Sequence, residues 1–479
     1  MDIPHAAWLR GNGLRGRWLT LVAVALAACA PLPFNRETAE PATLPTRTPV
    51  PILVTPASPT PNTDARLPTC AEAPPPLQTT EPRTTASPGK IVFVNAEGNI
   101  ALTDAEGRQQ VNLTEDAFVS PETGSGRIYR FPSFSNDGQF VGFVGLEADR
   151  TGEAQVVYVA RTEADAPPQA LFRTAEFNIP YLDWSPDDRW IAFLTINPSR
   201  GLIRLVPREG GEVNVLQQGA PTYWHWHPRD DALVTHLGGS AADSPEASVS
   251  LLTLLRSGEA RRTVLPALPG SFQSPHYAPD GKHMLYVAFD ERQPDRLVVA
   301  DAGGNPLCTV ATIRENAFFA WSPNGIEVAL MDTALPLTDP AALVLVNLRD
   351  GRSRTVHPAA STFFWSPDGR ALAVYAPQRS ERTGQIVGLR LSVINLDRNE
   401  ETELAILNPT RSFLQYVQYF DQYSRAVTPW SPDGRRLVFS GFSEESDRAE
   451  IYVGTLEQET QTWSVRRIAF GSVAFWSPK

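Results

Sequence analysis

One short motif, an aromatic residue followed by a turn close to Ser-Pro-Asp-Gly, recurs along this chain of 479 residues. Near-complete copies begin at Trp184, Trp226, Tyr277, Trp321, Trp365 and Trp430, a looser copy begins at Phe134, and a truncated copy begins at Trp476. Successive aromatics lie 42 to 65 residues apart. This period is typical of four-stranded units that stack as repeats.

Each copy of the motif predicts a strand, a turn and a second strand. In the copy at Trp365, the short apolar run 363–365 precedes the turn, whose Pro, Asp and Gly favour a tight reversal. The run 371–375 follows and is apolar on both faces, which indicates a strand buried between neighbouring units. Long amphipathic patterns are scarce, so the chain is predicted to be all-β.

The repeat predicts a single β-propeller. Eight motif aromatics imply eight innermost strands, so we expect eight blades, with seven as the alternative. Nothing follows the last of these strands, at 472–476, whereas the first β-like segment, at 90–114, lacks an innermost strand. We expect the C-terminal strand to complete the first blade, because this closure removes two exposed sheet edges. The motif aromatics are expected to pack between blades, since a ligand needs one site and not eight.

The repeated aromatic-Ser-Pro-Asp-Gly turn resembles that of the TolB-type, WD40-like (PD40) β-propeller repeat family over about residues 90–479. That group includes periplasmic scaffold propellers and the propeller halves of some peptidases. The resemblance therefore implies a propeller that binds partners, and it implies no catalytic residues. The chain departs from TolB because it shows no separate N-terminal α/β domain and has more repeats than the six blades that the resemblance suggests.

The N-terminus predicts a membrane anchor. Residues 1–28 combine three arginines with a short apolar core, as in a secretory signal peptide. The sequence Leu-Ala-Ala before Cys29 matches a bacterial lipobox, so we expect Cys29 to be lipidated. The alternative is an ordinary signal peptide with an incidental cysteine. The expected location is the bacterial cell envelope, facing the extracytoplasmic or periplasmic side.

Residues 29–89 are predicted to form a disordered stalk, followed by the propeller at 90–479. Between Pro31 and Gly89 the chain holds 15 prolines among many Thr, Ala and Ser residues, a composition that favours extended conformations. A recognition segment for a proline-binding partner is the alternative. Cys70 in the stalk and Cys308 in the ring either form a disulfide or remain two independent thiols.

Composition limits the classes of function. The formal net charge of −11 and the lack of a Lys/Arg cluster exclude a nucleic-acid surface. No GxSxG, HExxH or phosphate-binding glycine motif occurs, so no catalytic residue and no cofactor are assigned. We expect a monomeric propeller that reaches the membrane through its lipid alone.

Two departures from the repeat mark candidate sites. The residue before the motif aromatic is polar in three successive units, which gives the channel or ligand candidates Asp183, His225 and His276. Such a set could bind a divalent metal or simply line a wet channel. The longest interval carries the insertion 411–426, whose aromatic stripe either packs on the ring or contacts a partner: Phe413, Tyr416, Tyr419, Phe420 and Tyr423.

These features predict a lipid-anchored extracytoplasmic scaffold that binds a protein or an envelope component. The alternative is a metal-assisted lyase or hydrolase that acts on an extracellular polymer at the channel.

Overall fold

The computed structural model describes residues 54–55, 67–82, 84–85, 89–229, 231–271, 273–417, 420, 427–443, 446–457 and 459–479. The predicted signal peptide, Cys29 and much of the predicted stalk lie outside these residues. In the described part, no helix is long and apolar enough to cross a membrane.

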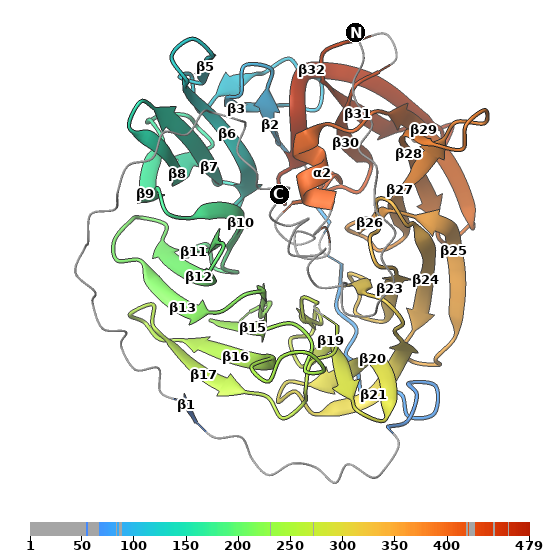
Figure 1. Ribbon diagram of the computed structural model, residues 1–479. Coiled ribbons are helices and arrows are strands. Elements are labelled where there is room, and N and C mark those ends of the chain that lie inside the picture. The colour runs from blue at the N-terminus through green and yellow to red at the C-terminus, as the bar shows by residue number, and fades with distance from the viewer. Residues whose placement is uncertain are drawn as a thin grey trace. The chain divides into compact units, whose positions relative to one another are not determined.

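The described strands form seven sheets arranged as a ring, so the fold is an all-β, seven-bladed propeller by its hydrogen-bonded sheets (Figure 1). In six of these sheets the consecutive strands of the chain are hydrogen-bonded neighbours, with one further strand added at the edge of one of them. The first two of these sheets comprise β5 (Phe118–Ser120), β6 (Ser125–Phe134), β7 (Phe140–Asp149), β8 (Gly152–Arg161) and β9 (Gln169–Thr174), then β10 (Asn178–Trp184), β11 (Trp190–Asn197), β12 (Arg200–Pro207) and β13 (Asn214–Gln218).

The next four sheets repeat this plan. They comprise β14 (Thr222–Trp226), β15 (Ala232–Leu237), β16 (Ser248–Leu254) and β17 (Ala260–Val264), with β1 (Val54–Thr55) parallel to β17; β18 (His276–Tyr277), β19 (His283–Asp290), β20 (Gln293–Asp301) and β21 (Pro306–Thr312); β22 (Ala317–Trp321), β23 (Glu327–Asp332), β24 (Ala341–Asn347) and β25 (Ser353–Ala360); and β26 (Thr362–Trp365), β27 (Ala371–Arg379), β28 (Ile386–Asn395) and β29 (Glu400–Leu407).

The seventh sheet joins the two ends of the ring. Its order is β30 (Arg436–Gly441), β31 (Glu450–Leu456), β32 (Trp463–Trp476), β2 (Ile91–Asn95), β3 (Ile100–Thr103) and β4 (Val111–Asn112).

The expected count of eight separate blades is not supported, because one continuous strand serves two repeats. Strand β32 pairs with β31 over its first part, up to Phe470, and with β2 from Gly471 to Trp476. The last and first repeats therefore share a single six-stranded sheet, and two motif aromatics, Trp430 and Trp476, belong to it. The predicted closure is confirmed, since the C-terminal strand pairs with the first strand of the ring.

The motif works through its buried serine. In the copy at Trp365, the hydroxyl of Ser366 donates to Asp368 at 2.6 Å and accepts the N–H of Ala371 at 2.9 Å. Gly369 takes a φ of +72°, which a residue with a Cβ adopts at a cost. Serine, aspartate and glycine thus fix the reversal that sends the next strand back along the blade.

Two of the motif tryptophans join neighbouring sheets through a hydrogen bond. Trp184 Nε1 donates to the carbonyl of Ser133 at 3.0 Å, and Trp430 Nε1 donates to the carbonyl of Phe364 at 3.0 Å. Each acceptor is the residue just before the motif aromatic of the preceding unit. Both indoles are 1% exposed, so the interpretation of these aromatics as packing residues is confirmed.

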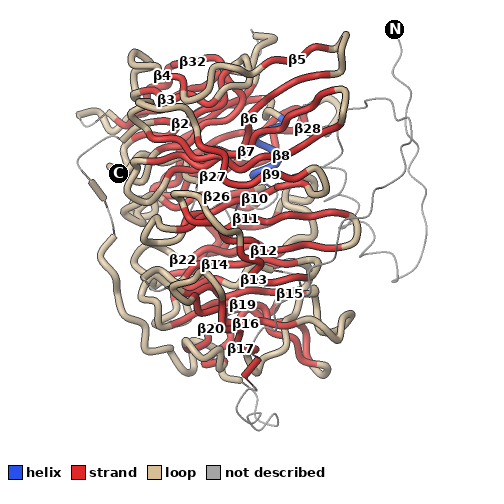
Figure 2. The backbone as a smooth tube through the Cα atoms, turned by 90° about the vertical axis from the view of Figure 1, so that its left-hand side faces the viewer, coloured by secondary structure: helices blue, strands red, loops and turns tan. Residues whose placement is uncertain are grey.

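Motif turns of neighbouring sheets contact one another and so form one face of the ring, here called the motif-turn face. An added Cβ on Gly325 or Gly369 would lie within 3.6 Å of the proline in the preceding turn. The connections between second and third strands, and the links from one sheet to the next, lie at the opposite end of the strands, here called the open face. Figure 2 shows the ring edge-on, with the C-terminus on one side.

Part of the predicted stalk lies along the ring instead of being disordered. Thr69 forms a parallel bridge with Thr309 in β21, and Cys70 and Cys308 form a disulfide. Further along, Thr85 donates its N–H to the carbonyl of Pro432. We call the described residues of 67–85 the strap. It runs from an outer strand of one sheet across the motif turns of several others.

Candidate functional site

The two predicted channel histidines lie against each other. His225 in β14 and His276 in β18 have ring centroids 4.7 Å apart, and His276 also meets the ring of Phe319 at 5.0 Å. His225 Nδ1 accepts the N–H of Tyr277 at 3.4 Å. The position before the motif aromatic thus brings two of the three predicted residues into ring contact.

His276 is held as a neutral imidazole. Its side chain is 2% exposed, and burial lowers its pKa to about 3. Its Nε2 has no hydrogen-bond partner among the described residues. A neutral, buried imidazole supplies one donor and one acceptor to the wall of the ring, but it carries no charge near neutral pH.

Asp183 does not complete a metal set with them. It is buried in β10, and its Oδ1 accepts the N–H of its own neighbour Trp184 at 2.8 Å. Among the described residues, no three His, Cys, Asp or Glu side chains are grouped closely enough to hold a metal ion. A ligand-binding role for Asp183, His225 and His276, as polar residues that line the channel, therefore stays a prediction.

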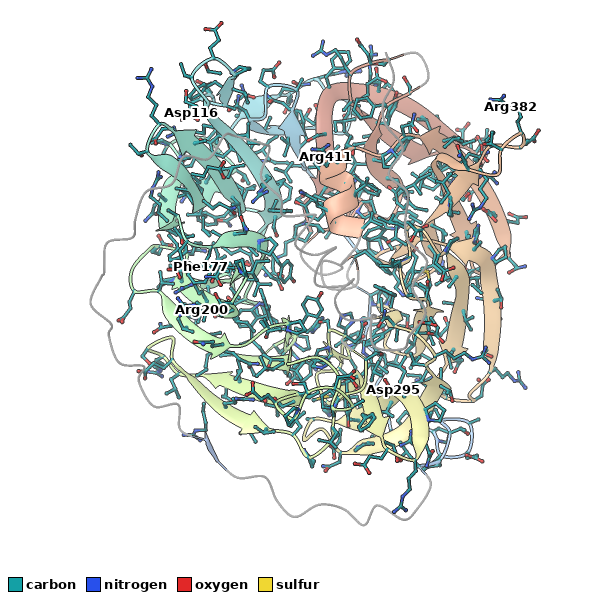
Figure 3. All side chains as sticks on the ribbon, in the orientation of Figure 1. Asp116, Phe177, Arg200, Asp295, Arg382 and Arg411 are labelled. Atoms are coloured by element: carbon teal, nitrogen blue, oxygen red, sulfur yellow. A yellow bond between two sulfur atoms is a disulfide. The ribbon has the colours of Figure 1, made fainter. Side chains whose placement is uncertain are left out.

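The aromatic insertion packs onto the ring. It begins as α2 (Arg411–Val417), which lies on the inner side of the sheets, and Figure 3 labels Arg411 at its first turn. Phe413 meets Tyr375 at 5.0 Å, while Tyr416 meets Phe131 at 5.6 Å and Phe475 at 4.7 Å between ring centroids.

Phe420 extends this packing to another part of the ring. Its ring lies 5.0 Å from that of Phe363 and 5.9 Å from that of Phe318. Phe413, Tyr416 and Phe420 are all under 8% exposed, so they serve as core and are not available to a partner in this structure. Tyr419 and Tyr423 lie outside the described residues, and their role as contact residues stays a prediction.

Exposed apolar side chains at the open face were not anticipated from the sequence. Four large hydrophobics in the described part are at least half exposed: Phe118 at 50%, Val119 at 60%, Leu268 at 54% and Val387 at 51%. The first two lie in β5, which pairs with the start of β6 and so lies far from the motif turn. Leu268 links β17 to β18, and Val387 lies just after the β27–β28 connection. For Phe118 and Val119 the sequence signal was the extra hairpin formed by β5 and the start of β6, which the other sheets lack within the described residues.

Comparison with known proteins supports the fold. No protein-family model and no curated protein matches the chain. Among solved structures, the dihydro-heme d1 dehydrogenase NirN is similar at 13% identity, with a TM-score of 0.51 over 86% of this chain and 80% of that one.

Two further solved structures show weaker likeness. TolB from Acinetobacter baumannii is 16% identical, with a TM-score of 0.36 over 65% of this chain and 78% of that one. An oligogalacturonate lyase in complex with manganese is 17% identical, with a TM-score of 0.46 over 72% of this chain and 96% of that one. At these identities the comparisons show no shared activity, and the β-propeller is established by the hydrogen-bonded sheets described above.

Proposed function

We propose that this protein is an extracytoplasmic binding scaffold, anchored to a bacterial membrane by a lipid on Cys29, which presents the open face of its propeller to a protein or another envelope component. The observation that carries the proposal is the attachment of the strap to the ring. Because the strap crosses the motif turns, the open face is the end of the propeller that the strap does not cover.

The disulfide between Cys70 and Cys308 supports an oxidising compartment. Both sulfurs are buried, with side chains at most 2% exposed, and their Cα atoms lie 4.9 Å apart. Structural disulfides persist mainly outside the cytoplasm. This agrees with the lipobox expected at Cys29 and with the proline-rich segment that follows it.

The apolar residues of the open face support partner binding. Exposed apolar side chains mark interaction sites where they form a contiguous patch, and the open face carries Phe118, Val119, Leu268 and Val387. Phe118 and Val119 lie in a hairpin strand that is largely exposed, so these two side chains add little to the core. Aromatic and aliphatic anchors of this kind dominate the energy of many protein interfaces.

Two experiments test the proposal separately. Replacing Cys29 with Ser should move the protein from the membrane fraction to the soluble fraction, and continued membrane retention would refute the lipid anchor. For binding, native membranes are treated with a chemical crosslinker, and the products formed with wild-type protein are compared with those of Phe118→Ser/Val119→Ser.

The double variant should lose a specific crosslinked product while keeping the melting temperature of the wild type. Leu255→Ser is the matched control, because Leu255 is 45% exposed but follows β16 at the motif-turn end. Equal crosslinking by both variants and wild type would exclude the open face as the docking surface.

A further inference from the structure

The strap shows how the motif-turn face holds an extended peptide. Gln78 lies in a notch between the motif turns that follow β18 and β22. Its backbone N–H donates to Asp280 Oδ2 at 3.4 Å, and Lys282 Nζ donates to its side-chain oxygen at 3.0 Å. One wall of the notch therefore supplies a carboxylate acceptor and a cationic donor, two residues apart in the motif.

The other wall of this notch supplies backbone carbonyls. The N–H of Thr80 donates to the carbonyl of Asn324 at 3.2 Å, and its hydroxyl donates to the carbonyl of Pro323 at 2.9 Å. None of these contacts needs a particular side chain on this wall, because the acceptors are main-chain groups of the turn.

A second notch of this kind lies between the motif turns that follow β10 and β14. It is an open pocket of about 310 Å³, lined by Pro186, Asp187, Arg189, Arg229 and Asp231. The strap does not reach this notch, since its described contacts run from β21 to the turn before β30.

The open notch repeats the donors and acceptors of the filled one. Asp187 and Arg189 occupy the motif positions of Asp280 and Lys282, so the carboxylate and the cation recur with the same spacing. Arg189 forms ion pairs with Asp187 in its own turn and with Asp231 on the opposite wall, the latter at 2.8 Å. These three side chains are 37–54% exposed, which leaves them accessible from solvent.

The two other notches nearby are closed by direct contacts. Between the turns after β6 and β10, Asp188 accepts the N–H groups of Asn136 and Asp137. Between the turns after β14 and β18, Arg229 donates to the carbonyl of Asp280 and His227 bonds the carbonyl of Gly281. The pocket between the turns after β10 and β14 is bridged by the side-chain pair of Arg189 and Asp231, without a main-chain contact of the kind that closes these two notches.

We propose that this notch binds an extended peptide segment of a partner protein, rich in threonine, glutamine and proline, in the way that the ring binds its own strap. The partner's main-chain N–H groups bond Asp187 and the turn carbonyls, and a side-chain amide oxygen accepts from Arg189. This site is separate from the open face, and its existence does not depend on the function proposed above.

The test uses a fluorescent peptide with the strap sequence of residues 77–85, Leu-Gln-Thr-Thr-Glu-Pro-Arg-Thr-Thr, and the full chain. Fluorescence anisotropy should show saturable binding that Arg189→Ala weakens about tenfold, because a hydrogen bond to a charged group is lost. Arg189→Lys, which keeps a cationic donor, should retain most of the affinity. Lys282→Ala is the matched control and should leave affinity unchanged, since its notch is already occupied by the strap.

Three outcomes would overturn the proposal. The first is no saturable binding at millimolar peptide. The second is a loss of affinity in Lys282→Ala that equals the loss in Arg189→Ala, which would mean that the peptide displaces the strap. The third is that residues 31–53 are protected from hydrogen exchange in the wild type and lose this protection in Arg189→Ala. That result would mean that the chain's own stalk occupies the notch. The open-face variant Phe118→Ser/Val119→Ser should bind the peptide normally, so a failure here is distinguishable from a failure of the scaffold function.

Discussion

Removing the disulfide between Cys70 and Cys308 should destabilise the ring markedly. The bond closes a loop across a sequence separation of 238 residues, so it restricts the unfolded chain strongly. With the chain-entropy relation for cross-links, a loop of this length corresponds to roughly 5 kcal/mol at 25 °C as an upper bound. The native contacts of the strap remain in the variant, because Cys70 also donates its N–H to the carbonyl of Thr309.

This free energy converts into a measurable shift in melting temperature. Unfolding entropies are about 2.1 cal/mol/K per residue, so a domain of roughly 400 residues unfolds with about 0.85 kcal/mol/K. Cys70→Ser/Cys308→Ser should therefore melt up to about 6 °C below wild type. Differential scanning calorimetry under oxidising conditions measures the shift, and adding a reductant to the wild type should reproduce it.

The third cysteine provides the control. Cys29→Ser leaves the disulfide intact, so its melting temperature should equal that of wild type. If the double variant melted with the wild type, and reductant had no effect on either, the strap would not restrain the unfolded chain and the reasoning would be refuted. Proteolysis adds a second readout, since cleavage within 67–85 should be faster in the double variant.

Three further results are expected. A chain that ends before Ser472 loses the pairing of β32 with β2 and should melt well below wild type or aggregate, and unchanged melting would contradict ring closure. Asp188 takes a φ of +60° and accepts three N–H bonds from Asn136 and Asp137. In urea unfolding, Asp188→Gly should lower the free energy of unfolding by about 2 kcal/mol, and Asp188→Ala should lower it by about 1 kcal/mol more because alanine strains the backbone at this φ. Equal losses in the two variants would exclude backbone strain. The pKa of His276 is about 3 in the folded chain and 6.5 in the unfolded chain, so between these values the unfolded chain binds a proton that the folded chain does not. This contribution to stability should be complete above about pH 6.5 and be lost as the pH falls towards 3, so the free energy of unfolding should decline less steeply in His276→Phe. Parallel pH profiles of the variant and the wild type would contradict this assignment.

The repeat was predictable because its determinants are local. Ser366, Asp368 and Gly369 act within a few residues of one another, and the sequence pattern therefore predicts the turn and the strands on both sides. The closure by β32 followed from the missing innermost strand at the start of the ring. The number of sheets did not follow, because whether β32 stays continuous depends on contacts with both β31 and β2.

The sites were less predictable because they depend on contacts between distant parts of the chain. His225 and His276 hold the same motif position in successive repeats and their rings do meet, but no local sequence feature determines whether Asp183 joins them. A proline-rich composition predicted disorder for the strap, although Leu67, Cys70 and Leu77 are apolar residues that a fully solvated stalk does not need. Both Leu67 and Leu77 pack against the cores of neighbouring sheets.

The sheet shared by the first and last repeats has a consequence for biosynthesis. Its closure brings together groups 387 residues apart, as in the bond from the N–H of Lys90 to the hydroxyl of Ser477. A ribosome must release nearly the whole chain before this contact can form, so the ring stays open throughout translation. Under the proposed export across a membrane, the ring can close only after the C-terminal strand has followed the rest of the chain. Folding is then left to the compartment in which Cys70 and Cys308 can be oxidised.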